Sequence, residues 1–378
     1  MNFDLKYLDK MEQKIFIEGK DLQAEGRKIV GTYCAFTPKE IISAAAAIPV
    51  GLCAGSQSPV STAEQYLPRN LCPLIKASYG HAVEKSCPYF NSCDYLLADS
   101  TCDGKKKMFE LLSRIKPLHL LHLPQTSLNA ESLDYWKNEL YKMKSIVENL
   151  TGNIITDDLL GEQIRLYNRY RKAVLSVYEL NKGDMPLIYG SEIDAIIGAT
   201  GFDCNIEERI KEIEAAVKII SQRADDPEFL EGIKNRPRIV LTGCPTTNKK
   251  VFDLLEECGA VIAAMENCGG QKTASLMVDE TGDPMTALAE RYLAIPCPCM
   301  TPNNTRLELI GELVKEYHAD GVLELTWQGC HTYNVEAYQV KEYVSEICGK
   351  PYIQIETDYS KNDSSQIKTR IEAFLELV

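Results

Sequence analysis

The stretch Ile29-Val30-Gly31-Thr32-Tyr33-Cys34 is a short run of apolar and β-branched residues that ends in a cysteine. A helical pattern opened by a proline follows it at residues 38–47, and a second strand-like run spans residues 49–52. Strands that alternate with helices pair in parallel, because each crossover helix returns the chain to the same edge of the sheet. The first block of the chain therefore predicts a doubly wound α/β fold.

The same alternation returns in the last third of the chain, after a long helical section. Further strands are predicted at residues 95–98, 118–123, 238–242, 260–265, 321–326 and 351–357. Between the two sets, Ile206, Ile210, Ile213 and Val217 recur at helical steps. We expect an N-terminal α/β domain over residues 1–130, a helical section over 131–235 and a C-terminal α/β domain over 236–378. Both α/β domains are expected to be Rossmann- or flavodoxin-like, with parallel sheets.

Cysteines recur at matching places in the two halves. Six of them follow predicted strands, three in each half: Cys34, Cys53, Cys102, Cys244, Cys268 and Cys330. In addition, Tyr66-Leu67 precedes Cys72-Pro73 as Tyr292-Leu293 precedes Cys297-Pro298-Cys299, which indicates an internal duplication. In open α/β sheets, ligands collect outside the carboxyl ends of the strands. Two such halves facing each other would bring several thiols into one cleft, an arrangement that favours a metal–sulfur cluster.

Composition excludes several classes of function. The chain has 378 residues and a formal net charge of -13, which argues against a nucleic-acid partner because phosphate binding needs clustered Lys and Arg. The one tight basic run, Lys105-Lys106-Lys107, is expected to be a solvated loop, or else a contact for an acidic partner. The longest apolar stretch, residues 41–55, is broken by Pro49, and the N-terminus shows no secretory signal. We expect a soluble, cytoplasmic protein without a membrane segment.

Fourteen cysteines in a reducing compartment indicate metal binding or redox chemistry rather than disulfides. Cys72, Cys102 and Cys330 each precede residues that favour a turn or a helix start, whose backbone N–H groups can donate to a thiolate. Four others are expected to be small buried hydrophobes: Cys53, Cys204, Cys258 and Cys348. The sequence has no Cys-x-x-Cys pair and no phosphate-binding loop, so zinc ribbons and nucleotide binding have little support.

Several motifs together resemble one protein family. They are Gly31-Thr32-Tyr33-Cys34, Asn70-Leu71-Cys72-Pro73-Leu74, Thr101-Cys102-Asp103-Gly104-Lys105, Glu266-Asn267-Cys268, Cys330-His331-Thr332-Tyr333 and Ile355-Glu356-Thr357-Asp358-Tyr359. Over nearly its whole length the sequence is similar to the 2-hydroxyacyl-CoA dehydratase and benzoyl-CoA reductase family. Within that family it most resembles the double-cubane cluster protein branch, which Ser86-Cys87-Pro88-Tyr89-Phe90 also marks.

The resemblance implies an iron–sulfur cofactor and a set of ligands. Dehydratase subunits of the family hold one four-iron cubane with three cysteines, at positions matching Cys72, Cys102 and Cys330. The double-cubane branch adds a second cubane, joined to the first by a bridging sulfide, and needs three further thiolates. The additional candidates are Cys87, Cys268, Cys34 and Cys299, with Cys297 as the alternate to Cys299. The resemblance thus implies two bridged 4Fe cubanes, and at minimum one 4Fe-4S cluster.

The implied chemistry is reduction of a small-molecule substrate at very low potential. In the family, a separate ATP-hydrolysing activator with its own iron–sulfur cluster supplies the electron. We expect an iron–sulfur reductase of this kind, forming a homodimer. Two alternatives stay open: a subunit of a 2-hydroxyacyl-CoA dehydratase with a single 4Fe-4S cluster, and an electron-transfer protein without its own substrate. Glu266, Glu356, Tyr333 and Tyr359 lie near predicted strand ends as candidate proton donors.

Overall fold

The computed structural model describes residues 6–127, 129–198 and 202–378, and these form two four-stranded parallel sheets. The strands of the first sheet are β1 (Ile29–Tyr33), β2 (Ile48–Gly51), β3 (Tyr95–Asp99) and β4 (Leu118–Leu121). Those of the second are β5 (Arg238–Gly243), β6 (Val261–Glu266), β7 (Gly321–Trp327) and β8 (Tyr352–Thr357). The predicted α/β fold with two parallel sheets is confirmed.

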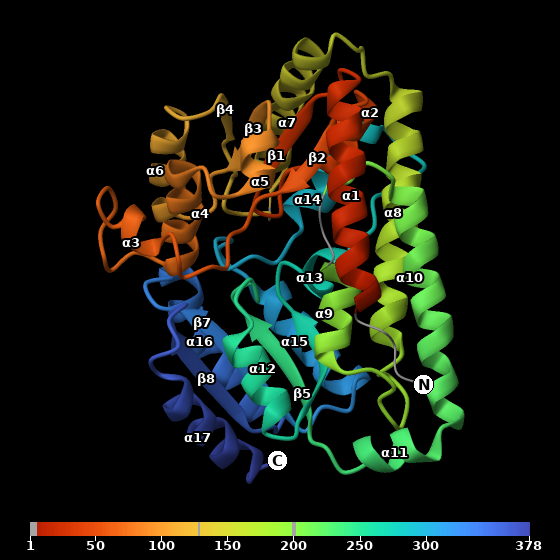
Figure 1. Ribbon diagram of the computed structural model, residues 1–378, viewed down its shortest axis with the longest axis vertical. Coiled ribbons are helices and arrows are strands. Elements are labelled where there is room, and N and C mark those ends of the chain that lie inside the picture. The colour runs from red at the N-terminus through yellow and green to blue at the C-terminus, as the bar shows by residue number, and fades with distance from the viewer. Residues whose placement is uncertain (1–5, 128, 199–201) are drawn as a thin grey trace.

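Helices connect the strands and cover the sheets (Figure 1). The first block contains α1 (Lys6–Ala24), α2 (Lys39–Ala44), α3 (Val60–Ala63), α4 (Pro73–Glu84), α5 (Pro88–Ser92) and α6 (Asp103–Leu112). The middle section contains α7 (Ala130–Thr151), α8 (Asp157–Glu179), α9 (Gly190–Gly198), α10 (Ile206–Ser221) and α11 (Pro227–Ile233). The last block contains α12 (Lys250–Glu257), α13 (Gln271–Ala274), α14 (Pro284–Leu293), α15 (Asn304–Glu316), α16 (His331–Glu342) and α17 (Ser364–Leu375).

The two sheets share one topology. Their strand orders are β2-β1-β3-β4 and β6-β5-β7-β8, so each strand of the first sheet has a counterpart in the second. All residues of β1, β5, β6 and β7 are buried, as expected for parallel strands with helices on both faces. The common order is what an internal duplication predicts.

Local sequence signals set the limits of the long middle helices. The side chains of Asn129, Thr156 and Asn205 accept hydrogen bonds from backbone N–H groups at the starts of α7, α8 and α10. Helix α7 ends at Gly152, whose φ of 77° suits a residue without Cβ. In contrast, α2 ends at Ala44 rather than continuing to residue 47, because the chain turns through Ala46 at a φ of 58°.

The helical section ties the two halves together. Helix α14, from the second half, packs against α7 and α8, and its apolar face joins the core beside the first sheet. A buried polar contact fixes this arrangement: Arg171 of α8 pairs with Glu40 of α2, and the Tyr292 hydroxyl of α14 donates to Glu40 at 2.7 Å. A buried carboxylate is stable only when paired, so these three helices are held in one relative position.

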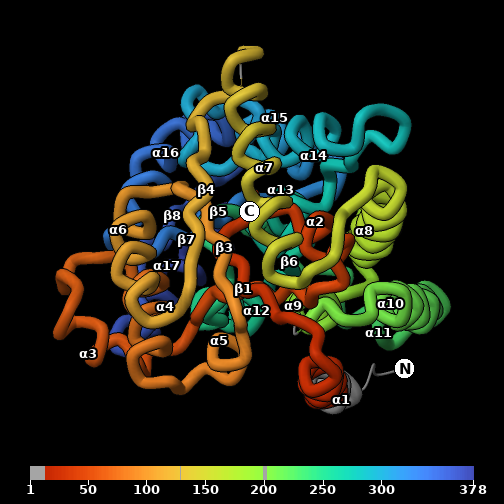
Figure 2. The backbone as a smooth tube through the Cα atoms, turned by 90° about the horizontal axis from the view of Figure 1, so that it is seen from above, coloured from red at the N-terminus to blue at the C-terminus, as the bar shows by residue number. Residues whose placement is uncertain are grey.

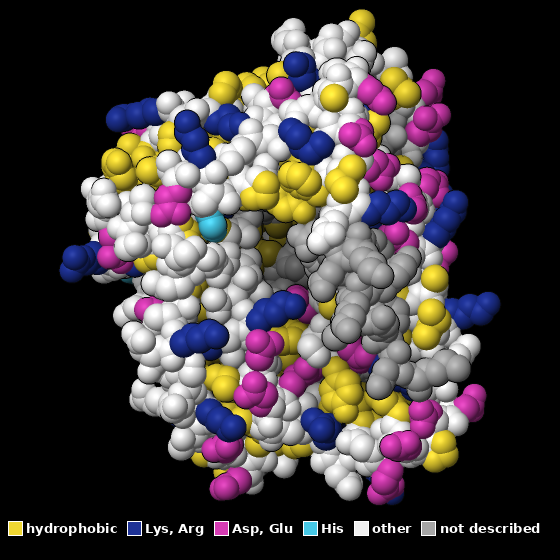
Figure 3. All heavy atoms as spheres, in the orientation of Figure 1, with side chains coloured by type: hydrophobic (Ala, Val, Ile, Leu, Met, Phe, Trp, Pro, Cys, Tyr) yellow, Lys and Arg dark blue, Asp and Glu magenta, His cyan; other side chains and the backbone are white. Residues whose placement is uncertain are grey.

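The two halves are stacked with their sheets one above the other, as Figure 1 and the view from above in Figure 2 show. The loop after β2 reaches the loops after β5 and β8: Asn248 donates to the Gly55 carbonyl at 3.0 Å, and the hydroxyl of Tyr359, which follows β8, donates to the Ala54 carbonyl, also at 3.0 Å. A Cβ at Gly55 would overlap the Thr247 carbonyl oxygen, so only glycine permits this approach. Figure 3 shows the surface hollowed where the halves meet. No helix among the described residues is long and apolar enough to cross a bilayer.

Candidate functional site

The cysteines that follow strands occupy equivalent places in the two halves. Because the strand orders match, β1 corresponds to β5, β2 to β6 and β3 to β7. The pairs that follow these strands are Cys34 and Cys244, Cys53 and Cys268, and Cys102 and Cys330. Each half therefore directs three thiols from its own sheet toward the boundary between the halves, and all fourteen cysteines of the chain are free of disulfides.

We call Cys72, Cys244 and Cys330 the first thiol group. Cys330 acts electrostatically on both Cys72 and Cys244, so the three thiols lie close to one another. Cys72 is the residue that precedes α4 and Cys330 the residue that precedes α16, so both thiols lie where backbone N–H groups lack intrahelical partners. The Cys244 sulfur accepts a hydrogen bond from the Trp327 N–H at 3.4 Å. Two of the three predicted primary ligands, Cys72 and Cys330, are thus brought together from opposite halves.

A glycine makes the first thiol group possible. Gly329 has a φ of 72°, and a Cβ there would lie 2.5 Å from the carbonyl oxygen of Asn70. The loop before Cys330 therefore rests directly on the backbone before Cys72. Only glycine combines this left-handed conformation with so close an approach.

Interactions within the first thiol group shift the pKa values of its three cysteines in opposite directions. Bonds from Cys244 and Cys72 hold the pKa of Cys330 well below its usual value, even though burial opposes this. The bond with Cys330, together with burial, raises the pKa of Cys72, and burial together with the same kind of bond raises that of Cys244. The group therefore favours one thiolate held by two thiols, and the thiolate is the form that binds metals.

We call Cys34, Cys297 and Cys299 the second thiol group. A hydrogen bond from Cys299 and the positive charge of Lys272 lower the pKa of Cys297 to about 7, although burial opposes them. The hydrogen bond with Cys297 raises the pKa of Cys299, with burial and the charge of Cys34 adding to the effect. This group also draws on both halves, since Cys34 follows β1 and the other two follow α14.

Cys34 has a cation as its direct neighbour. The Lys105 ammonium donates to the Cys34 sulfur at 2.8 Å, and the Thr101 hydroxyl lies 3.3 Å from it. Burial raises the pKa of Cys34, and the Lys105 charge acts against that rise. The run Lys105-Lys106-Lys107 is therefore not the solvated loop expected from the sequence: it lies in α6, with Lys105 turned toward the thiols while Lys106 and Lys107 are exposed.

Cys102 and Cys268 lie near both a thiol group and a lysine. Burial raises the pKa of Cys102, and the charges of Cys330 and Cys297, one from each group, both act on it. Burial also raises the pKa of Cys268 to about 11, with Lys272 opposing and Cys297 reinforcing the shift. The third primary candidate, Cys102, thus lies between the two groups.

Two further cysteines differ from the others. Cys87 precedes α5, where its sulfur accepts a hydrogen bond from the Phe90 N–H at 3.4 Å. Its charge acts on Cys93 and Tyr33. Cys87 thus belongs to neither of the two thiol groups. Cys53 is exposed, so its expected role as a buried hydrophobe is wrong. Its charge acts on Cys34 and Cys268, which places it at the same boundary.

Sequence reasoning missed two charged residues of the site, Lys105 and Asp99. Asp99 ends β3 and is fully buried; its Oδ2 accepts from the Phe36 N–H at 2.7 Å, while Oδ1 has no hydrogen-bond partner among the described residues. Burial raises the pKa of Asp99 to about 7. An acidic residue that ends an otherwise apolar strand was the available signal. For Lys105, the signal was its place one helical turn after Cys102.

The arrangement of donors fits a cluster better than a single ion. Among residues 6–127, 129–198 and 202–378, no three His, Cys, Asp or Glu side chains converge as a mononuclear metal site would require. In an iron–sulfur cubane each thiolate binds a different iron, so the thiolates need not converge on one point. The buried side-chain amide of Asn267, beside Cys268, has no partner for its N–H groups among the described residues, as a donor to sulfide would. The residues present therefore fit an iron–sulfur cluster.

Comparison with known proteins agrees over nearly the whole chain. Residues 34–378 match the family described as 2-hydroxyglutaryl-CoA dehydratase, D-component. The chain is 41% identical to the Escherichia coli (strain K12) protein named "Putative dehydratase subunit YjiM", over 96% of this chain and 94% of that protein.

More distant relatives belong to both dehydratases and reductases. The chain is 25% identical to the beta subunit of (R)-phenyllactyl-CoA dehydratase of Clostridium sporogenes, covering 94% of this chain and 93% of that protein. It is 24% identical to one of the benzoyl-CoA reductase subunits of Thauera aromatica, covering 92% of this chain and 89% of that protein. The resemblance drawn from the motifs is confirmed, and the chain belongs to the 2-hydroxyacyl-CoA dehydratase and benzoyl-CoA reductase family.

Proposed function

We propose that this chain is an iron–sulfur oxidoreductase that carries two bridged cubanes and reduces a small molecule at low potential. The observation that carries the proposal is the presence of two thiol groups, each built from both halves of the chain. A single cubane held by three cysteines would leave the second group without a purpose.

The resemblance implies the proposed ligands, and the positions of the thiols support them. The first cubane is assigned Cys72, Cys102 and Cys330, with Cys244 as an additional thiol within reach of Cys330. The second is assigned from the remaining thiols of the boundary, and the candidates are Cys34, Cys268, Cys297 and Cys299. Cys87, at the start of α5, is the weakest member of the set.

Such a cluster supplies electrons at low potential and offers an iron at which a small substrate can bind. Residues of this chain would hold the cluster and offset its negative charge. Lys105 and Lys272 bring two positive charges to the thiols, and these offset part of the negative charge of several thiolates in a setting of low dielectric. A separate ATP-hydrolysing activator as electron donor, and a homodimer in the cytoplasm, complete the proposed function, as the family resemblance implies.

A second candidate is a dehydratase subunit with one 4Fe-4S cluster. The names of the relatives favour it, because the 41% identical protein is named a dehydratase subunit and a 25% identical one is the beta subunit of (R)-phenyllactyl-CoA dehydratase. Such a chain would act with a second subunit on an acyl-CoA substrate. An electron-transfer protein without its own substrate is the third possibility.

Paired substitutions separate these candidates. The chain is purified without oxygen in three forms, with the substitutions Cys72→Ser and Cys330→Ser, with Cys268→Ser and Cys299→Ser, or with the control Cys258→Ser alone. Cys258 follows α12 and belongs to neither thiol group, so it should leave iron unchanged. With two cubanes, each paired variant loses about half of roughly eight irons per chain.

Other outcomes contradict the proposal in distinct ways. Roughly four irons, lost with the first pair and kept with the second, would support the dehydratase subunit. Two cubanes that bind no small ligand, such as carbon monoxide, at the reduced cluster would support the electron carrier. A wild-type chain without iron would contradict all three.

A further inference from the structure

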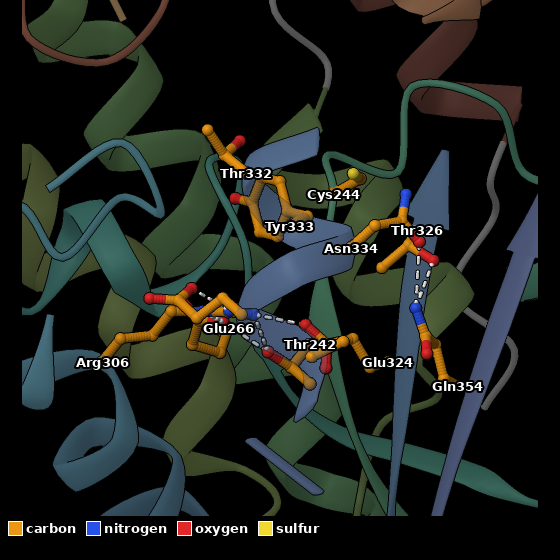
Figure 4. A network of polar contacts seen from close by, with 12 residues as sticks. Thr242, Cys244, Glu266, Arg306, Glu324, Thr326, Thr332, Tyr333, Asn334 and Gln354 are labelled. Atoms are coloured by element: carbon orange, nitrogen blue, oxygen red, sulfur yellow. Dashed lines mark hydrogen bonds and ion pairs between the residues drawn. The ribbon is translucent and has the colours of Figure 1, made fainter. Parts of the chain in front are cut away.

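A polar network centred on the buried Arg306 lies in the second half, and Figure 4 shows its members Thr242, Glu266 and Glu324. Glu266 ends β6 and forms ion pairs with Lys272 at 2.9 Å and with Arg306 at 3.1 Å, and none of these three side chains is exposed to solvent. Arg306 also pairs with Glu324 at 2.9 Å and with Glu336 at 2.5 Å. Buried charges of this kind are stable only when each is paired, so the network has one rigid arrangement.

Lys272 links this network to Tyr333 by a hydrogen bond. Its ammonium donates to the Tyr333 hydroxyl oxygen at 2.7 Å. An ammonium has hydrogens to give and no lone pair to accept one, so the tyrosine oxygen must be the acceptor in this bond. The hydroxyl hydrogen of Tyr333 is therefore turned away from Lys272, and it has no acceptor in the described part of the chain.

The ring of Tyr333 is fixed in the same way. Lys272 lies 4.9 Å from the ring centroid and the Arg306 guanidinium 5.0 Å from it, so two cations rest against the aromatic face. The residue is also buried. The bond from Lys272 and the two neighbouring cations therefore hold the ring and its hydroxyl in one orientation.

Tyr333 also joins the two sets of thiols. It belongs to the first turn of α16, the helix that Cys330 of the first thiol group directly precedes. Its side chain meets Lys272 of α13, the short helix that begins three residues after Cys268, and the charges of Cys268 and Cys297 act on its hydroxyl. One residue therefore belongs to the helix that follows the first group and bonds through its phenol to the segment that follows Cys268. Strand β2, which corresponds to β6, ends at Gly51 where β6 ends at Glu266. The described part of the first half therefore lacks the counterpart of this carboxylate.

We propose that the Tyr333 hydroxyl, oriented by Lys272, donates a hydrogen bond to a sulfur atom of the iron–sulfur cluster that the two thiol groups would hold. The inference rests on the proposed function, because it requires a sulfur-bearing group in the boundary. Tyr333 is a positioning residue in this account. A hydrogen bond to a cluster sulfur stabilises the reduced, more negative state and so raises the midpoint potential.

The test compares three forms of the full chain purified without oxygen: wild type, Tyr333→Phe and the control Tyr352→Phe. Tyr352 donates to Glu324 at 2.6 Å on the other side of the same network, so its substitution disturbs the network without touching the thiols. Iron and sulfide content is measured first, and the midpoint potential is then followed by electron paramagnetic resonance during a redox titration. We expect a more negative potential for Tyr333→Phe, and wild-type behaviour for Tyr352→Phe.

A second substitution keeps the test decisive if Tyr333→Phe fails to load iron. Incorporation of 3,5-difluorotyrosine at position 333 makes the hydroxyl a stronger donor without removing it, and the potential should then move upward. Equal potentials in wild type, Tyr333→Phe and the fluorinated chain overturn this inference alone, as does an equal shift in Tyr352→Phe. A wild-type chain that binds no iron overturns both this inference and the proposed function.

Discussion

At the scale of single residues, the site depends on how buried charges are balanced. Burial raises the pKa of many of the thiols, among them Cys34, Cys102 and Cys268. Lys105 and Lys272 oppose it from opposite halves of the chain, one beside Cys34 and one beside Cys268 and Cys297. Because a buried charge is screened less than an exposed one, each lysine exerts a large effect on its thiols.

The first prediction concerns Lys105. Lys105→Met removes the ammonium that donates to Cys34, so the pKa of Cys34 should rise and its thiolate should become rarer. We expect alkylation of Cys34 by iodoacetamide in the metal-free chain to slow by roughly tenfold at a fixed pH. The matched control is Lys106→Met, which removes an exposed lysine that pairs with the exposed Asp103. Equal rates in the two variants would show that Lys105 does not act on Cys34.

The second prediction concerns Asp99 and pH. Its pKa is raised from 3.8 to about 7, so the folded chain holds this proton over a range where the unfolded chain has lost it. The protonated Asp99 carboxyl therefore contributes its full stabilisation of the folded state below pH 3.8. This contribution declines between pH 3.8 and about 7 and is lost above that range. Asp99→Asn stays neutral at every pH, and its amide oxygen can still accept from the Phe36 N–H.

We therefore expect Asp99→Asn to gain stability relative to wild type as the pH rises from 5 to 8, by on the order of a few kcal/mol. Urea unfolding of the metal-free chain at both pH values measures this difference. The exposed Asp103 provides the control, because Asp103→Asn should show no such pH-dependent gain. A wild-type to Asp99→Asn difference that is independent of pH would contradict the account.

At the scale of elements, three of the cysteines lie immediately before the first residue of a helix. Cys72, Cys102 and Cys330 each immediately precede a helix, α4, α6 and α16 respectively. The positive end of the helix dipole and the unpaired N–H groups favour an anionic sulfur there. The sequence predicted this for all three residues, because Pro73, the Asp103-Gly104 pair and the residues after Cys330 are local signals. It could not predict that Cys244 joins Cys72 and Cys330, since that contact depends on how two distant loops meet.

The third prediction tests how those loops meet. Gly329→Ala adds a Cβ that would lie 2.5 Å from the Asn70 carbonyl oxygen, at a φ of 72°. We expect it to move the Cys330 loop away from Cys72, to lower iron content and to destabilise the chain by more than ~2 kcal/mol. Gly349→Ala is the matched control: its φ is 63° but nothing lies within 4 Å, so it should carry only a backbone penalty of about 1 kcal/mol.

Thermal unfolding and iron analysis check this pair of glycine variants. We expect a clear difference between the two variants, with iron lost from Gly329→Ala and retained by Gly349→Ala. If both lose the same stability and neither loses iron, the contact between the loops at Asn70 and Gly329 does not hold the thiols in place.

Strands were more predictable than the site for a physical reason. The apolar, β-branched runs that form β1 and β5 are buried by any parallel sheet, so their local pattern is sufficient. The roles of Lys105 and Cys53 depend on tertiary contacts rather than on the local sequence pattern. A lysine run is solvated in most proteins, and the contact with Cys34, which follows the neighbouring strand β1, turns Lys105 inward.

At the scale of the whole molecule, two halves with one topology face each other across the thiols. Their common strand order places corresponding cysteines on both sides of the boundary. Each thiol group takes cysteines from both halves, so neither group forms unless the halves face each other. The halves have also diverged, since the network of Glu266, Lys272 and Arg306 belongs to the second half alone.

The central claim is that the boundary holds two cubanes. Native mass spectrometry of the chain purified without oxygen tests it most directly, because one spectrum gives the mass of bound iron and sulfide and the number of chains. We predict an added mass of about eight irons with their sulfides on each chain. An added mass of about four irons, or none, on every chain would contradict the account.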